Sequence, residues 1–306
     1  MTAIREIATG LRFPEGLIAM PDGSIVLVEI AARRLSRITK DGRVQPIAEL
    51  GGGPNGAAIG PGGKCYVCNN GGLEWYERSG HLIPGFNETR PGCIQVVDLD
   101  TGKFETLYDS CDGRPFSAPN DLVFDAQGGF WFTDHAKTSR RERVRGSLYY
   151  AKADGSSVRE VISQLDGPNG VGLSPDEKRV YVAETNPGRI WAFDIARPGE
   201  VAKNPNAIYY GRGHLLAGVP GYQLFDSLAV DSGGWVCVAT IHNGGITAAS
   251  PDGKTVTHTP LPDSLVTNVC FGGTDLRTAY ATLSGTGKLV AFDWPRPGLA
   301  LNYLSQ

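Results

Sequence analysis

Short apolar runs separated by polar turns follow one another along the whole chain. In residues 117–134, a polar residue, Asn120, precedes an apolar run, a turn at Gly128 and Gly129, and a second apolar run around Trp131. Runs of this length, bounded by Gly, Pro and Asp, are typical of β-strands. Helical periodicity is scarce, and 41 glycines and 20 prolines punctuate the apolar runs. The pattern therefore predicts an all-β protein.

The strand–turn–strand unit recurs six times, each time with a polar residue at its head. The six heads are Glu15, Asn55, Asn120, Asn169, Asp226 and Asn268, at spacings of 40, 65, 49, 57 and 42 residues. A period of this length, with room for two further strands, is typical of a propeller blade. The sequence predicts one six-bladed β-propeller domain over residues 1–306. The longer spacings indicate insertions at about 74–92, 136–146 and 197–220, and residues 4–8 are expected to complete the last blade.

The second apolar strand of each unit is expected to run antiparallel to the first, so that its end returns to the level of the head. This places a further group of polar residues near the same rim. The group is Glu29, Asn69, Asn70, Asp134, His135, Glu184 and His242.

Composition and charge narrow the range of partners. The formal net charge is −3, so neither nucleic acid nor an anionic membrane is the expected partner. The arginines within 140–145 are interpreted as a solvated loop.

Six cysteines are too few for a disulfide framework, and Cys65 and Cys68 fall in one strand, where they face opposite sides. Neither a signal peptide nor a transmembrane run is recognisable, so we expect a cytoplasmic protein. The oligomeric state is left open.

The heads carry the candidate chemistry, because the first strand of every propeller blade lines the central channel. Two carboxylates and four amides converging on one ring all supply oxygen, which suits a hard cation such as Ca²⁺. Asn and Asp also cap strands and turns, which is the simpler interpretation of any single copy. Six unpaired polar groups in one register would be costly to bury without a cation or water. The sequence therefore predicts a central metal site.

The chain resembles the family of senescence marker protein, gluconolactonase and luciferin-regenerating enzyme over nearly its whole length. The matching stretches are 13–17, 119–121, 168–171, 225–228, 267–273 and 292–298. This resemblance implies a six-bladed propeller that hydrolyses a small-molecule lactone with one divalent metal ion, for which Ca²⁺ is favoured over Mg²⁺, Mn²⁺ or Zn²⁺. It further implies that Glu15, Asn169 and Asp226 bind the metal, with Asn120 as a fourth ligand or a substrate contact.

The remaining polar residues of the ring and rim are expected in supporting or substrate-binding roles. Asn55 and Asn268 share the register of the ligands without matching the family's usual metal set. Family members with Arg two residues before the matching Asn use it to hold sugar lactones, whereas Ala118 stands here. Asn70, His135, Tyr222 and His242 are further candidate substrate contacts, and for each histidine a surface or hydrogen-bonded role is the alternative. The aromatic insertion after Leu73 is either a lid opposite Tyr222 and Phe225 or a self-packed loop.

The expected chemistry is ring opening of a lactone. The metal would act as a Lewis acid on the carbonyl while a carboxylate, Asp226, activates water or attacks directly. Two alternatives stay open: hydrolysis of an organophosphate or another ester, and a non-catalytic propeller that binds calcium or a ligand.

Overall fold

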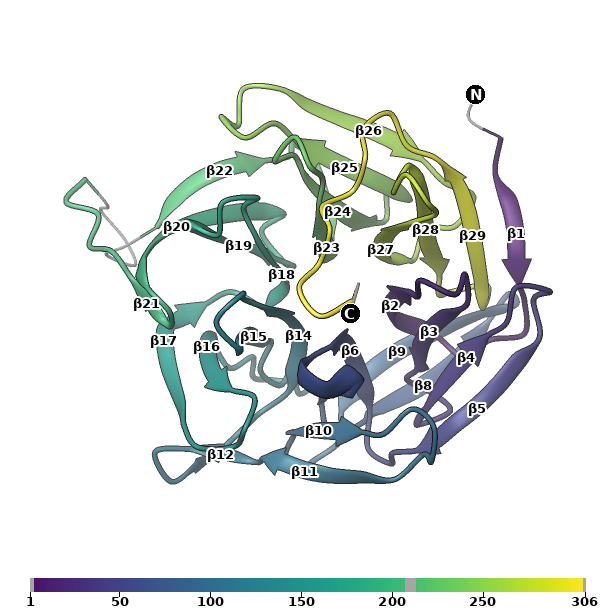
Figure 1. The fold of residues 1–306 in the computed structure, drawn as a ribbon, viewed down its shortest axis with the longest axis horizontal. Helices are drawn as coiled ribbons and strands as arrows, with labels where there is room; N and C mark the ends of the chain where they lie inside the picture. Colours follow the sequence, from purple (N-terminus) through teal and green to yellow (C-terminus); the bar gives the residue numbers. More distant parts are fainter. Residues whose placement is uncertain (1–2, 207–212, 305–306) are drawn as a thin grey trace.

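The computed structural model describes residues 3–206 and 213–304 and forms a ring of six antiparallel sheets around a central channel (Figure 1). In this part of the chain, no helix is long and apolar enough to cross a membrane. Each sheet is one blade, and its first strand lies innermost. The predicted six-bladed propeller is confirmed.

The strands of the first three blades follow the sequence pattern. Blade 1 contains β2 (Pro14–Ala19), β3 (Ile25–Glu29), β4 (Arg34–Ile38) and β5 (Val44–Glu49). Blade 2 contains β6 (Pro54–Ile59), β7 (Cys65–Asn69), β10 (Cys93–Val97) and β11 (Phe104–Tyr108), with a short 3₁₀ turn at Pro61–Gly63. Blade 3 contains β14 (Pro119–Phe124), β15 (Gly129–Asp134), β16 (Gly146–Lys152) and β17 (Val158–Leu165).

The other three blades have the same order from the channel outward. Blade 4 contains β18 (Pro168–Leu173), β19 (Arg179–Glu184), β20 (Arg189–Arg197) and β22 (His214–Gly218), with β21 (Glu200–Val201) paired to β20. Blade 5 contains β23 (Leu224–Val230), β24 (Val236–Ile241), β25 (Gly245–Ala249) and β26 (Val256–Pro260). Blade 6 contains β27 (Val266–Gly272), β28 (Thr278–Leu283), β29 (Lys288–Asp293) and β1 (Arg5–Ala8).

The N-terminal strand closes the ring. β1 pairs antiparallel with β29, so the expected completion of the last blade by residues 4–8 is confirmed (Figure 1). One expectation needs correction. The segment 197–220 was expected to be an insertion, but its residues 214–218 form β22, the outer strand of blade 4, because they pair with β20.

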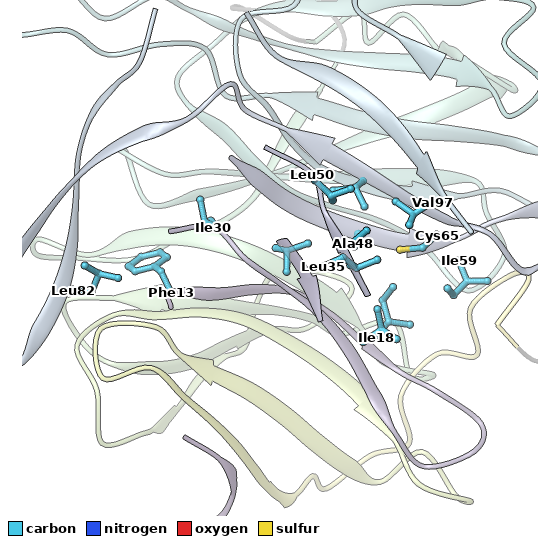
Figure 2. Packing of buried hydrophobic residues seen from close by; sticks show 14 residues of the cluster. Phe13, Ile18, Ile30, Leu35, Ala48, Leu50, Ile59, Cys65, Leu82 and Val97 are labelled. Carbon is cyan, nitrogen blue, oxygen red and sulfur yellow. The ribbon is translucent and has the colours of Figure 1, made fainter. Parts of the chain in front are cut away.

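The hydrophobic core lies between neighbouring blades. Figure 2 shows the cluster between blades 1 and 2, where Leu35 of blade 1 and Val97 of blade 2 are both fully buried. Cys65 belongs to this cluster, whereas Cys68 belongs to the cluster between blades 2 and 3. The two cysteines therefore face opposite sides of their strand, as expected, and all six cysteines are free thiols.

Two insertions form small sheets outside the blades. β8 (Leu73–Arg78) and β9 (His81–Asn87) form a hairpin that leaves blade 2, and β12 (Ser110–Cys111) pairs with β13 (Arg114–Pro115). The hairpin lies against blade 1 on the side away from the viewer in Figure 1. Its Trp75 ring lies 4.9 Å from the Phe13 ring, and the Leu82 amide donates to the Gly285 carbonyl of blade 6 at 2.9 Å.

Candidate functional site

A β-bulge at the head position shapes the innermost strands. In blades 2 to 5, three residues of the inner strand span the same length as two residues of its neighbour, as between Phe225 and Leu228 opposite Thr240 and Val238. Blades 1 and 6 also shift register near their heads. A bulge leaves a residue out of the regular ladder and re-aims its side chain. The six heads are thus placed at one level of the channel.

The glycines after the heads allow adjacent inner strands to approach closely. A Cβ atom on Gly56 would lie 2.5 Å from the Asn120 carbonyl oxygen, and one on Gly170 would lie 2.8 Å from the Asp226 carbonyl oxygen. Real Cβ atoms do not come this near to backbone, so these positions require glycine. The Asn-Gly pairs of the sequence therefore bring neighbouring heads together as well as marking strand starts.

Burial separates Asp226 from the other five heads. Glu15, Asn55, Asn120, Asn169 and Asn268 are all buried. Asp226 keeps partial solvent exposure although protein groups surround its carboxylate on most sides. Asp226 is therefore the head that solvent reaches most readily.

Three buried oxygen atoms in the ring have no hydrogen-bond partner. They are Glu15 Oε1, Asn120 Oδ1 and Asn169 Oδ1. Within residues 3–206 and 213–304, the other buried side-chain atoms without a partner are all nitrogens, on Trp131, His258 and Trp294. An unmatched buried acceptor typically costs about 1–3 kcal/mol, so such atoms need an explanation. Three oxygens at one level of one channel are what a bound cation would require.

The carboxylate of Glu15 is held in place by its other oxygen. Glu15 Oε2 accepts hydrogen bonds from the Gly16 amide at 2.8 Å and from Asn268 Nδ2 at 2.7 Å, and Ser227 Oγ lies at 3.4 Å. Burial raises the pKa of Glu15 well above its usual value, and repulsion from Asp226 raises it further. The Asn268 amide is thus committed to orienting Glu15 rather than pointing freely into the channel.

The amide of Asn169 and the carboxylate of Asp226 lie side by side on blades 4 and 5. Asn169 Nδ2 donates to Thr185 Oγ1 at 3.1 Å, which leaves Oδ1 as its free atom. Burial raises the pKa of Asp226 to about 7, and a polar contact with Asn169 only partly offsets this. A carboxyl group with a pKa near neutrality can exchange protons at physiological pH.

Asp121 is a third carboxylate of the ring that sequence reasoning missed. It follows the head Asn120, in the place where three other blades carry Gly16, Gly56 and Gly170. Burial raises the pKa of Asp121 to about 7, and its charge raises the pKa values of Glu15 and Asp226. Among the residues that the structure describes, no basic side chain contributes to the pKa shift of any of the three. The break in the Asn-Gly pattern was the available signal.

The donor set fits a hard cation better than a transition metal. Within the described ranges, no three His, Cys, Asp or Glu side chains are grouped so that they alone could hold a metal ion. The set at the ring instead combines carboxylate and amide oxygens, which are the ligands of Ca²⁺ and Mg²⁺. The three unpartnered oxygens and the repulsion that Asp121 and Asp226 exert on Glu15 both fit a divalent cation.

The rim residues differ in how far they are committed to other contacts. Asn70 is buried, and its Oδ1 accepts from the Gly72 amide at 2.9 Å. His135 Nδ1 lies 3.3 Å from the Ala136 carbonyl, and burial lowers the pKa of His135. A Cβ on Gly167 would lie 3.0 Å from His135 Nε2, so this nitrogen lies beside Gly167. Gly167 precedes the head Asn169 by two residues.

Tyr222 and His242 form an aromatic pair at the top of blade 5. Their ring centroids lie 4.6 Å apart, and Tyr222 is 74% exposed. Tyr222 lies two residues before the start of β23, the strand that contains Asp226, and His242 follows the last residue of β24. Phe225, which was expected to face the insertion with Tyr222, is fully buried between blades 4 and 5 instead, because its side chain faces away from the channel.

The residues at the ends of the second strands lie level with the heads, as expected, and serve the scaffold. Glu29 and Asp134 pair in register with Pro14 and Pro119, one residue before a head. Asp134 accepts from the Ser117 and Ala118 amides at 2.7 Å each. Glu29, Asn69 and Glu184 likewise accept from backbone amides of the loops that lead into their blades. These groups fix the loops rather than entering the channel.

Comparison with known proteins finds a matching family and individual relatives. Residues 13–285 match the family model described as SMP-30/Gluconolactonase/LRE-like region. A gluconolactonase of Zymomonas mobilis is 26% identical over 300 residues, which cover 89% of this chain and 76% of that protein. A pentonolactonase, XacC, of Haloferax volcanii is 26% identical over 288 residues, which cover 93% and 86%.

A solved structure shares the fold. A calcium-binding protein, regucalcin, of Agrobacterium tumefaciens superposes with a TM-score of 0.74 at 18% identity, over 98% of each chain. The family match covers most of the present chain and includes all six heads. The chain therefore belongs to the SMP-30/gluconolactonase/LRE-like family of six-bladed propellers.

Proposed function

We propose that this protein hydrolyses a small lactone with the help of one divalent cation, for which Ca²⁺ is favoured. The proposed ligands are Glu15, Asn120, Asn169 and Asp226. The observation that carries the proposal is the group of three buried, unpartnered oxygens on Glu15, Asn120 and Asn169. Lactonase relatives that cover most of this chain support the reaction class.

The residues present fit such a cation by chemistry and by charge. All four proposed ligands offer oxygen, and two of them are carboxylates whose pKa values are raised by burial. The charge of Asp226 further raises the pKa of Glu15, and the charge of Asp121 further raises that of Asp226. When bound, a divalent cation supplies a Lewis acid for the lactone carbonyl. Its charge would also relieve the repulsion among Glu15, Asp121 and Asp226.

Asp226 is the proposed base. It is the head with the most solvent access, so water beside the cation can reach it. Binding to the cation would lower the pKa of Asp226, so the base in this proposal is a carboxylate oxygen that does not itself hold the cation. In the proposed reaction, water oxygen bonds to the carbonyl carbon while Asp226 takes its proton. The ring C–O bond then breaks, and the leaving oxygen takes the proton back from Asp226 to become the hydroxyl of the product acid.

The other residues of the ring and rim are proposed to position these groups. Asn268 orients Glu15 through its hydrogen bond, and Asn55 completes the ring beside them. Asn70, His135, Tyr222 and His242 are proposed to line the space above the ring that takes the substrate. The exposed Tyr222 and His242 rings offer an apolar and aromatic surface next to the strand of Asp226.

The test is a pH-indicator screen across sugar, aliphatic and aromatic lactones, with chelated protein and with Ca²⁺, Mg²⁺ or Mn²⁺ restored. We expect chelation to abolish turnover and one of the cations to restore it. Full turnover in chelated protein would contradict the metal-dependent mechanism. Tight calcium binding without turnover on any lactone would favour a non-catalytic propeller, and turnover only on phosphate or simple esters would favour the other hydrolase.

A matched pair of variants tests the role of Asp226. Asp226→Asn should lose turnover, whereas Asp194→Asn, at an exposed carboxylate of β20, should keep it. Calorimetry with Ca²⁺ on both variants separates loss of the cation from loss of the base. If Asp226→Asn binds the cation and still opens lactones at the full rate, Asp226 is not the base.

A further inference from the structure

The half of the channel on the far side of the oxygen ring contains a cavity of about 230 Å³. Its walls come from the inner strands of all six blades, just beyond the heads. The apolar side chains in these walls include Leu17, Ile59, Leu122, Val171, Leu228 and Val269. Asp121 and Asn268 line it where it meets the ring, and Ser174, Glu177 and Asn302 line it toward the opposite mouth. Polar groups thus stand at its two ends and apolar groups between them.

The segment after β29 turns inward across blade 5, on the side toward the viewer in Figure 1. Figure 1 shows it in yellow, leaving the rim of the ring and ending at the centre. Arg296 pairs with the fully buried Asp231, and its guanidinium lies 4.1 Å from the centre of the Trp235 ring. The Ser232 amide donates to the Pro297 carbonyl at 2.9 Å. These contacts fix the direction in which the segment leaves β29 of blade 6.

The segment then spans the mouth of the channel and contacts the blades opposite. The Leu299 amide donates to the Val230 carbonyl at 3.1 Å, and Asn302 Nδ2 donates to the Phe124 carbonyl at 3.1 Å. The Tyr303 ring lies 5.5 Å from the Phe124 ring. Leu299, Leu301 and Leu304 line the cavity from this side. The segment therefore forms the floor of the cavity, anchored on blades 3 and 5.

Water is a poor occupant for the middle of such a cavity. A buried water needs two to four polar partners, and the side chains of Leu122, Val171 and Leu228 in the middle of the wall offer none. An engineered cavity of about 150 Å³ lined by Leu, Ile and Phe stays dry and binds benzene or xenon. The present cavity is larger than that and is walled by the same kinds of side chain.

We propose that this cavity, between the oxygen ring and the segment 294–304, is a second binding site, which takes a small apolar molecule about the size of benzene or somewhat larger. The site is separate from the proposed substrate site, since the ring of heads lies between them. Neither its location nor its ligand class depends on the lactonase proposal.

The test uses fluorobenzene and xenon as probes of the full-length protein. Fluorine NMR should show saturable binding of fluorobenzene, and crystals under xenon pressure should show xenon among Leu122, Val171 and Leu228. Ala229→Phe, which adds a ring at the cavity wall, should remove fluorobenzene binding. Val256→Phe also introduces a phenyl ring, but on the exposed outer strand of the same blade, and should leave binding unchanged.

A second filling variant guards against misfolding of the first. Ala300→Phe fills the cavity from the segment and leaves the inner strands unaltered. Absence of both fluorobenzene binding and a xenon site in the wild type would overturn the proposal. Fluorobenzene binding that survives both filling variants would place the probe elsewhere and would equally overturn it.

Discussion

Replacing Asn120 with leucine should make the cation-free protein more stable and at the same time remove its response to calcium. Asn120 is buried, and its Oδ1 has no hydrogen-bond partner. Leucine has nearly the same shape and no acceptor to leave unmatched. An ordinary substitution at a buried polar position destabilises, so a gain in stability would be diagnostic.

The size of both effects follows from the unmatched oxygen. Removing a buried acceptor that lacks a partner should recover about 1–3 kcal/mol of unfolding free energy in the chelated protein. A cation that binds only the folded wild type adds about 2.7 kcal/mol at a free concentration near 100 times its Kd. The Asn120→Leu protein lacks one of four proposed ligands and should show little of this second gain.

The assay is urea unfolding followed by tryptophan fluorescence, with chelator and with Ca²⁺. Asn55→Leu is the matched control, because Asn55 is a head of the same register without a buried unpartnered oxygen. It should keep most of the calcium response. If Asn120→Leu is less stable than the wild type in chelator and gains as much from Ca²⁺, Asn120 does not bind a cation.

Three further outcomes are expected. Asn268→Ala removes the 2.7 Å hydrogen bond to Glu15, worth about 1.5 kcal/mol or more, and should weaken calcium binding about tenfold in calorimetry; unchanged affinity would refute the orienting role. Burial lowers the pKa of His135, so the folded state disfavours its protonation. The wild type should therefore lose stability relative to His135→Gln as the pH falls below about 6.5, by at most about 1.4 kcal/mol per pH unit. Parallel curves of stability against pH for the two proteins would contradict this. Gly16→Ala should lower the free energy of unfolding in urea by over about 1 kcal/mol, because a Cβ there meets the neighbouring strand. Gly62→Ala, which is also at positive φ but in open space, should lower it less. Equal losses in the two variants would assign the effect to φ alone.

The repeat in the sequence predicted the blades well because its signals are local. Apolar strands of fixed length, with a turn after each head, specify a blade without reference to distant residues. The pairing of residues 5–8 with β29 was also predictable, since an unpaired strand at one end of a closed ring has a single vacant edge to join. The level of the heads followed from the same register.

Long-range features were harder to predict. The path of residues 294–304 across the channel depends on contacts such as that of Arg296 with Asp231, which no local pattern reveals. Strand β22 was hidden because it is only five residues long, from His214 to Gly218, and its apolar run is short. Asp121 was overlooked because a carboxylate beside a head looks like a turn residue until the neighbouring strand is seen against it.

The bulges at the heads separate the identity of each head from the integrity of its blade. Because a bulged residue stands outside the regular ladder, changing it alters the channel without disturbing the cross-strand pairs that hold the sheet. This holds for the four heads of blades 2 to 5, at which different side chains can be placed one at a time, whereas Glu15 and Asn268 stay paired with Val28 and Thr282 in the ladders of blades 1 and 6. Such a propeller can change its ligand set, and with it its chemistry, through single substitutions that leave folding intact.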